Sequence, residues 1–108
     1  MERSVRNRKK GASLIMLDKK IRPHPQVVDT KLDDGELVLL QLESKSYYSL
    51  NLAGERIWRG LKQGLSLREI SRRLQEEFDV GEDEAHSSVL ELVDNLCEQN
   101  LASHSKND

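Results

Sequence analysis

The chain has 108 residues, of which about a third are charged and only 4% are aromatic. This length suits one domain with a small, mostly aliphatic core. The single cysteine, Cys97, excludes an internal disulfide. The sequence contains no apolar run long enough to cross a bilayer and no secretory signal pattern, so we expect a cytoplasmic protein that does not enter a membrane.

Charge is distributed unevenly along the chain. Residues 1–22 contain eight Lys or Arg and two Asp or Glu, whereas residues 23–108 contain nine and seventeen. A basic arm can bind nucleic acid, or it can be a solvated, partly disordered extension. We therefore divide the chain into a basic extension over residues 1–22, a domain over residues 23–101, and a polar tail over residues 102–108. Within the extension, residues 12–17 are apolar enough to form an extra strand, dock on a partner or exchange between two copies of the chain.

Three strands are predicted in the first half of the domain. Residues 27–32 form the first, and the Asp33-Asp34-Gly35 turn leads into residues 37–42. This second run is apolar at almost every position, which suits a central strand buried on both faces. Residues 46–50 form the third strand. It must lie at an edge of the sheet, because such short loops allow only neighbouring strands to pair.

A helix follows the third strand directly. Asn51 is a good N-cap for it, and Trp58, the only tryptophan, is expected to anchor the core from this helix. Side chains alternate between the two faces of a strand. On the third strand the two residues expected to face the core are Tyr48 and Leu50, and the two expected to face outward are Tyr47 and Ser49.

Two further helices complete the predicted domain. Ser66 and Glu69 form a capping box for the first, and three acidic residues open the second, where the helix dipole favours them. The last helix has a wide apolar stripe. We assign Ala85, Val89, Leu92 and Leu96 to the core, and Leu90, Val93 and Cys97 to an exposed shoulder. The sequence therefore predicts an α+β, winged-helix-like domain in which a three-stranded antiparallel sheet is followed by three helices.

Residue patterns typical of enzymes and metal sites are missing from the sequence. His24, His86 and His104 stand far apart without paired ligands, and Cys97 lies on an apolar helix face that suits an inert thiol. A glycine-rich phosphate loop is also missing. We therefore expect a binding protein that has no catalytic residues, metal or cofactor.

Two kinds of binding remain. In the first, the last two helices bind duplex DNA as a winged helix, but the acidic start of the last helix would repel phosphate. In the second, an extended peptide adds to the edge strand at residues 46–50, beside the apolar shoulder. The edge could instead be covered by the N-terminal segment or by a second copy of the chain. The peptide interpretation is favoured, and the nucleic-acid interpretation is kept as its alternative.

The order of elements and several short segments resemble the PqqD family from about residue 23 to residue 101. The most specific segment is Leu-Asn-x-x-Gly-x-x-Ile-Trp, which ends at Trp58, and the Tyr47-Tyr48-Ser49-Leu50 strand and the Ser66-Leu-Arg-Glu-Ile70 helix start also match. The resemblance implies a non-catalytic peptide chaperone. Such proteins bind the leader of a ribosomally made precursor peptide and present it to a modifying enzyme, often a radical S-adenosylmethionine protein.

In that family the leader adds to the third strand and lies against the third helix. The resemblance therefore implies a peptide site made of Ser46, Tyr47, Tyr48, Ser49, Leu50, Val89, Leu90, Val93, Asp94 and Cys97. The 22-residue extension departs from the short family pattern. The pathway is therefore left open between pyrroloquinoline quinone biosynthesis and that of a lasso peptide or another modified peptide.

Overall fold

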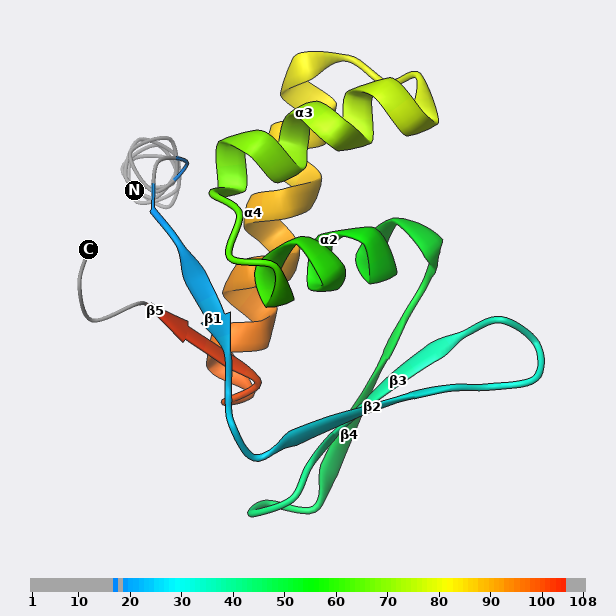
Figure 1. Ribbon diagram of the computed structural model, residues 1–108, viewed down its shortest axis with the longest axis vertical. Coiled ribbons are helices and arrows are strands. Elements are labelled where there is room, and N and C mark those ends of the chain that lie inside the picture. Colours follow the sequence, from blue (N-terminus) through cyan, green and yellow to red (C-terminus); the bar gives the residue numbers. More distant parts are fainter. Residues whose placement is uncertain (1–16, 18, 105–108) are drawn as a thin grey trace, which may run out of the picture.

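The structure is a computed structural model that describes residue 17 and residues 19–104. Its main sheet has the strand order β2 (Val27–Lys31), β3 (Leu37–Gln41) and β4 (Ser46–Leu50), with antiparallel pairing throughout. Three helices follow, α2 (Leu52–Lys62), α3 (Leu67–Phe78) and α4 (Glu82–Glu98), and all three lie on the same side of the sheet (Figure 1). The predicted α+β fold is confirmed. None of the helices in this part of the chain is long and apolar enough to cross a membrane.

A second, two-stranded sheet joins the two ends of the described chain. Strand β1 (Ile21–Pro23) pairs antiparallel with β5 (Ala102–His104), and the two lie side by side in Figure 1. Leu17 and Ile21 are buried in the core, and the backbone oxygen of Leu17 accepts a hydrogen bond from the Arg68 amide at 2.8 Å. The packed domain therefore extends beyond residues 23–101 at both ends. Of the apolar run at residues 12–17, residues 12–16 lie outside the described residues.

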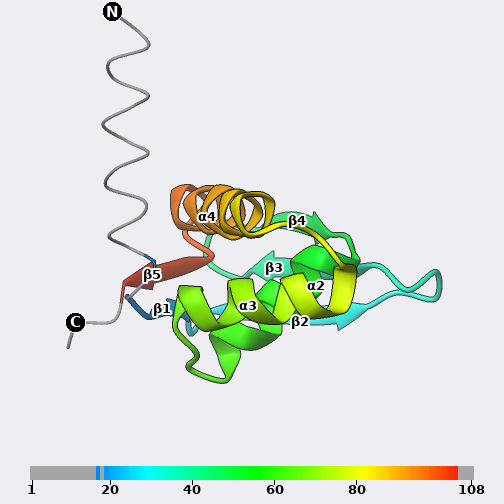
Figure 2. The same ribbon diagram turned by 90° about the horizontal axis from the view of Figure 1, so that it is seen from above.

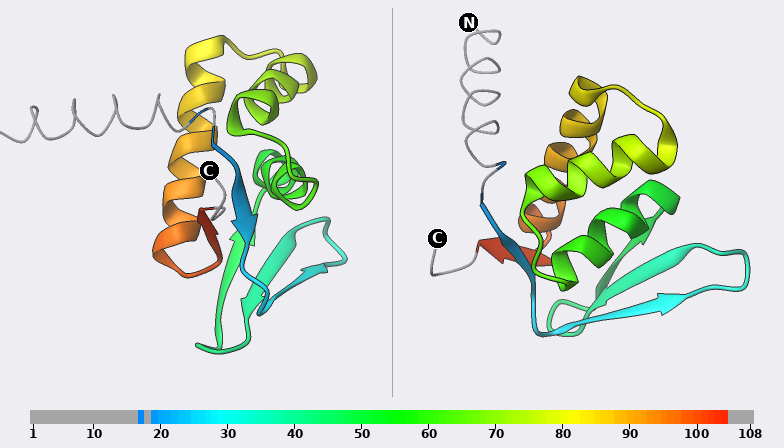
Figure 3. Two further views of the ribbon diagram at one scale, coloured as in Figure 1. Left: turned by 60° about the vertical axis from the view of Figure 1, so that its left-hand side comes forward. Right: turned by 45° about the horizontal axis from the view of Figure 1, so that its top comes forward.

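Strand β3 is central, as predicted, but it is not buried on both faces. Leu37 and Leu39 are buried under the helices, whereas Leu40 is 38% exposed and Val38 is half-buried. The reason is that helices cover only one face of this sheet, as the views in Figure 3 show. An apolar run cannot by itself reveal whether a second layer covers the outer face.

Both predicted helix caps are present. The Asn51 side-chain oxygen accepts a hydrogen bond from the Gly54 amide at 2.8 Å, and the Ser66 hydroxyl accepts one from the Glu69 amide at 3.2 Å. Each bond satisfies one of the unpaired N–H groups in the first helical turn. Asn51 therefore fixes the point at which the chain leaves the edge strand β4 and enters α2.

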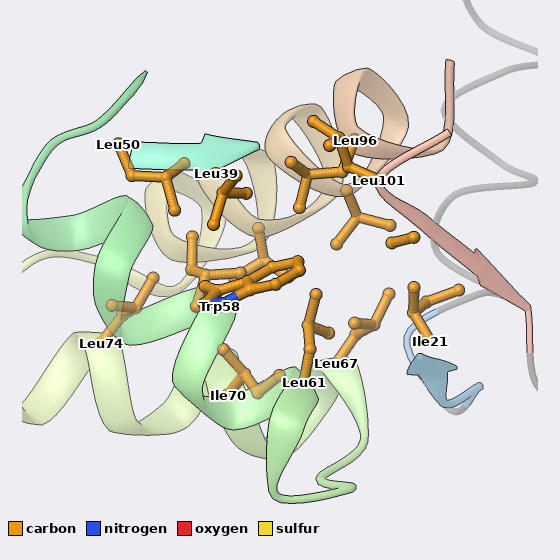
Figure 4. Close-up of a cluster of buried hydrophobic side chains, with 14 of the residues drawn as sticks. Ile21, Leu39, Leu50, Trp58, Leu61, Leu67, Ile70, Leu74, Leu96 and Leu101 are labelled. Carbon is orange, nitrogen blue, oxygen red and sulfur yellow. The ribbon is translucent and has the colours of Figure 1, made fainter. Parts of the chain in front are cut away.

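Trp58 lies at the centre of the core, with aliphatic side chains from every layer around it (Figure 4). Its indole N–H is directed toward the sheet and donates a hydrogen bond to Asp29 of β2 at 2.8 Å. Helices α2 and α3 approach each other closely at Gly60, where an added Cβ would lie only 2.6 Å from Cγ1 of Ile70. These contacts hold α2 between the sheet and α3, and they fix the position of its N-terminus beside β4.

Candidate functional site

Strand β4 forms one edge of the main sheet. It pairs with β3 on one side, and no strand of the described chain lies on its other side. In an antiparallel pair, alternate residues direct their backbone N–H and C=O groups away from the partner strand. The outer side of β4 therefore offers a row of hydrogen-bonding groups to an additional strand.

A groove of about 430 Å³ runs beside this edge. Helix α4 forms its far wall, and Figure 2 shows α4 alongside β4 when the molecule is viewed from above. Three secondary-structure elements and two connecting segments contribute to the lining, which consists of Glu36, Tyr48, Ser49, Leu50, Asn51, Ala53, Gly54, Ile57, Ser88, Glu91, Leu92 and Asn95. The groove thus places an open strand edge, an apolar floor and a helix flank next to one another.

The start of α2 forms part of the groove because Gly54 allows a close approach to the strand. A Cβ added at Gly54 would lie 3.1 Å from Cδ2 of Leu50 and 3.3 Å from the Asn51 side-chain oxygen. Both neighbours are constrained, since Leu50 is buried and Asn51 caps the helix. Gly54 therefore has a packing role at the edge of the groove.

Helix α4 presents one flank to the groove. Ser88, Glu91, Leu92 and Asn95 recur at the three- and four-residue spacing that aligns side chains along one side of a helix. The amide group of Asn95 donates a hydrogen bond to the Tyr48 hydroxyl at 3.4 Å. This contact links α4 directly to β4 and sets the width of the groove at that point.

The structure brings only part of the expected site together. Tyr48, Ser49 and Leu50 line the groove, with Tyr48 half-buried and Leu50 buried, as the strand alternation predicts. Tyr47 is 74% exposed and points to the outer face of the sheet. Ser46 precedes Tyr47 as the first residue of β4, and it does not line the groove. The predicted inward and outward directions of this strand are confirmed.

The expected residues of α4 do not line the groove. Val89 and Val93 are buried in the core and are not among the residues that line the groove. At about 100° per residue, Leu90, Asp94 and Cys97 lie on the flank of α4 opposite the groove-lining residues. The prediction placed Leu92 in the core and Val93 on the shoulder, and the structure reverses this assignment. The one signal that could have located the groove flank is the spacing of polar residues around Leu92.

The chemistry of the groove follows from its lining. Its floor is apolar, and its charged lining residues are both acidic, Glu36 and Glu91. An extended ligand could therefore form main-chain hydrogen bonds with β4 and place an apolar side chain on the floor. A Lys or Arg side chain would be favoured at the rim because it would compensate the two carboxylates.

A separate charged cluster lies at the opposite edge of the sheet. The carboxylate of Asp29 accepts hydrogen bonds from Lys62 at 2.7 Å and from Trp58, and these donors lower the pKa of Asp29. The buried carboxylate of Glu55 accepts a hydrogen bond from Lys31 at 2.6 Å, which lowers its pKa. These contacts join β2 to α2 and stabilise the fold away from the groove.

The remaining groups considered are the possible metal ligands and the cysteine thiol. No group of three or more His, Cys, Asp or Glu side chains in the described residues could hold a metal ion. Cys97 is half-buried, and its burial, with a further contribution from Asp94, raises the pKa of the thiol. A raised pKa leaves less of the nucleophilic thiolate at neutral pH.

Two solved structures resemble most of the described domain. One is "TbiB1 in Complex with the TbiA(beta) Leader Peptide", which has 28% sequence identity and a TM-score of 0.69, with 75% of this chain and 93% of that chain covered. The other is "Lasso peptide synthetase B1 complexed with the leader peptide", with 29% identity and a TM-score of 0.71 over 77% of this chain and 96% of that chain. A search of curated proteins found no match.

The sequence model described as "Coenzyme PQQ synthesis protein D (PqqD)" matches residues 36–102. This region starts at the turn before β3 and includes β4, the three helices and the beginning of β5. It therefore contains every residue that lines the groove. The match covers more than half of the chain, and together with the strand and helix order it shows that this protein belongs to the PqqD family.

Proposed function

We propose that this protein binds the leader segment of a ribosomally made precursor peptide and presents it to a modifying enzyme. The observation that carries the proposal is the open edge of β4 beside a groove that has an apolar floor, two carboxylates and α4 as its far wall. The two solved relatives, which are covered almost completely, are each described as complexes with a leader peptide. The acidic groove offers no comparable support for the nucleic-acid alternative.

In this proposal the leader adds to β4 as a fourth, antiparallel or parallel strand. Alternate residues of β4 supply main-chain hydrogen bonds, which give affinity without requiring a particular sequence. Specificity comes from the side chains that alternate along the bound strand. Those that face inward contact Leu50, Ile57 and Leu92, and a basic residue nearby compensates Glu91.

The protein acts in this scheme as a carrier and not as a catalyst, in the cytoplasm and without a cofactor of its own. Its second partner is the enzyme that modifies the precursor. Because one relative is a lasso peptide synthetase B1, we favour a lasso-type precursor over pyrroloquinoline quinone biosynthesis. A radical S-adenosylmethionine enzyme, which the family resemblance implies, is kept as an alternative class of partner.

The groove can be tested with two leucines of the same helix. Leu92 lines the groove, whereas Leu90 is also half-buried but lies on the opposite flank of α4. The ligand is the fluorescently labelled leader of the precursor encoded beside the gene of this protein, and binding is measured by fluorescence anisotropy. We expect Leu92→Lys to weaken binding about tenfold or more, because it places a charge in the centre of the contact.

Leu90→Lys is the matched control and is expected to change the dissociation constant by less than about twofold, as is usual away from the centre of an interface. Thermal unfolding of both variants establishes that each remains folded at the assay temperature. Equal losses in the two variants, or a larger loss for Leu90→Lys, would contradict the assignment of the groove. Absence of binding by the wild-type protein would contradict the proposed function itself.

A further inference from the structure

The outer face of the main sheet is not covered by any part of the described chain. Alternation along the three strands places six residues on this outer sheet face: Val28, Thr30, Val38, Leu40, Tyr47 and Ser49. None of the six carries a charge at neutral pH, although 33% of the residues in the chain are charged. The outer sheet face therefore differs in charge from the average composition of the chain.

The strand register aligns the larger apolar side chains in one row. Val28 pairs with Leu40, and Leu40 pairs with Tyr47, so the row crosses all three strands. The exposed fractions of the three side chains are 45%, 38% and 74%. Directly paired side chains on one face are close enough to touch. The row is therefore a continuous apolar strip rather than three isolated residues.

The size of the outer sheet face indicates the kind of partner it fits. Three five-residue strands span about 17 Å by about 14 Å, a footprint of roughly 240 Å². A stable protein–protein interface buries about 800 Å² on each partner. Two copies of this face would therefore be too small to hold a dimer alone. The face fits the apolar centre of a contact with a larger protein, whose surroundings supply the remaining area.

The outer sheet face is also continuous with the proposed peptide site. Tyr47 belongs to β4, the strand whose free edge would pair with the leader, while Tyr48 and Leu50 of the same strand face the groove. A protein seated on the strip would lie beside the bound peptide without blocking the groove, because Val28, Leu40 and Tyr47 face outward and none of them lines the groove. This is the position that transfer of the peptide to an enzyme requires.

We propose that the Val28–Leu40–Tyr47 strip binds an uncharged, apolar patch on the enzyme that modifies the precursor. This inference rests on the proposed function and assigns its second partner to a surface. The contact is transient in the absence of other interactions because the strip is small. The structure thereby separates peptide capture at the groove from enzyme docking on the outer sheet face.

The test uses Leu40→Lys, which places a charge in the middle of the strip on an exposed strand position. The matched control is Ser103→Lys, which places the same charge on an exposed strand position of β5, outside both the strip and the groove lining. Binding to the purified modifying enzyme encoded beside the gene is measured by biolayer interferometry. Binding of the labelled leader is measured in parallel on the same preparations.

We expect Leu40→Lys to weaken enzyme binding about tenfold or more, with leader binding changed less than about twofold, while Ser103→Lys alters neither. Unchanged enzyme binding by Leu40→Lys, or no enzyme binding by the wild-type protein, would overturn the proposal. A wild-type dimer in sedimentation velocity that Leu40→Lys converts to a monomer would also overturn it, because a second copy would then occupy the strip. If the wild-type protein does not bind the leader, the proposed function itself is refuted.

Discussion

Gly60→Ala tests the close packing of α2 against α3, on which the position of the groove depends. Gly60 is buried within α2, and an added Cβ would lie 2.6 Å from Cγ1 and 2.8 Å from Cδ1 of Ile70. Ile70 is itself buried, so relief requires a movement of the two helices or a strained side chain. Such overpacking costs about 1–3 kcal/mol. Replacing a helical glycine by alanine gains at most about 1 kcal/mol.

The steric cost should therefore exceed the helix-propensity gain. We expect the free energy of unfolding to fall by about 1 kcal/mol and the melting temperature by roughly 5 °C. Urea unfolding followed by circular dichroism measures the change. The control is Ser87→Ala, at an exposed position inside α4, and it should remain within about 0.5 kcal/mol of the wild type.

A double-mutant cycle with Ile70→Val identifies the source of the loss. This change removes the Cδ1 contact but retains the Cγ1 contact, so it should rescue Gly60→Ala only in part, with a coupling of about 0.5–1 kcal/mol. A Gly60→Ala protein more stable than the wild type would refute the reasoning. So would strict additivity of the two changes.

Two further predictions concern polar groups in the core and at its edge. Hydrogen bonds from Lys62 to Asp29 and from Lys31 to Glu55 are the largest causes of the lowered pKa values of these two carboxyl groups. Their contribution to the free energy of unfolding is therefore present above their ordinary pKa values and is lost as the pH falls through the lowered ones. We expect the free energy of unfolding to decrease below about pH 4.5, and Asp29→Asn to be less sensitive to acid than the wild type; equal pH profiles in urea titrations would contradict this. The buried Ser71 hydroxyl has no hydrogen-bond partner among the described residues. Ser71→Ala should therefore raise the free energy of unfolding by roughly 0.5–1 kcal/mol. A destabilised variant in the same urea titration would contradict this, because it would show that the hydroxyl forms a hydrogen bond.

The strands and helices of the main domain could be predicted because local signals agree with the tertiary structure. Asn51 and Ser66 cap helices at the predicted positions, and the alternation in β4 correctly sends Leu50 inward and Tyr47 outward. The β1–β5 sheet was missed because it pairs segments about eighty residues apart, each only three residues long. Short segments carry little periodicity, and their pairing depends on the position of the whole domain between them.

The structure places the expected strand residues Tyr48, Ser49 and Leu50 at the groove, whereas the expected residues of α4 lie elsewhere on the helix. The apolar stripe of α4 is wide enough that Leu92 and Val93 are both plausible core residues, although they differ by about 100° around the helix axis. Sequence periodicity locates the centre of such a stripe poorly when apolar residues occupy both its margins. Which of the two residues is in the core depends on the packing of the helix: Val93 is buried there, while Leu92 is half-buried and lines the groove.

The most direct test of leader binding is an NMR study of the isotope-labelled protein with the unlabelled leader peptide. We predict chemical-shift changes confined to β4, the start of α2 and the Ser88–Glu91–Leu92–Asn95 flank of α4. Alternate amides of β4 should become slow to exchange with solvent, because new main-chain hydrogen bonds protect them. Shifts concentrated on Leu90, Asp94 and Cys97, or β4 amides that exchange as fast with the peptide as without it, would contradict strand addition at this groove.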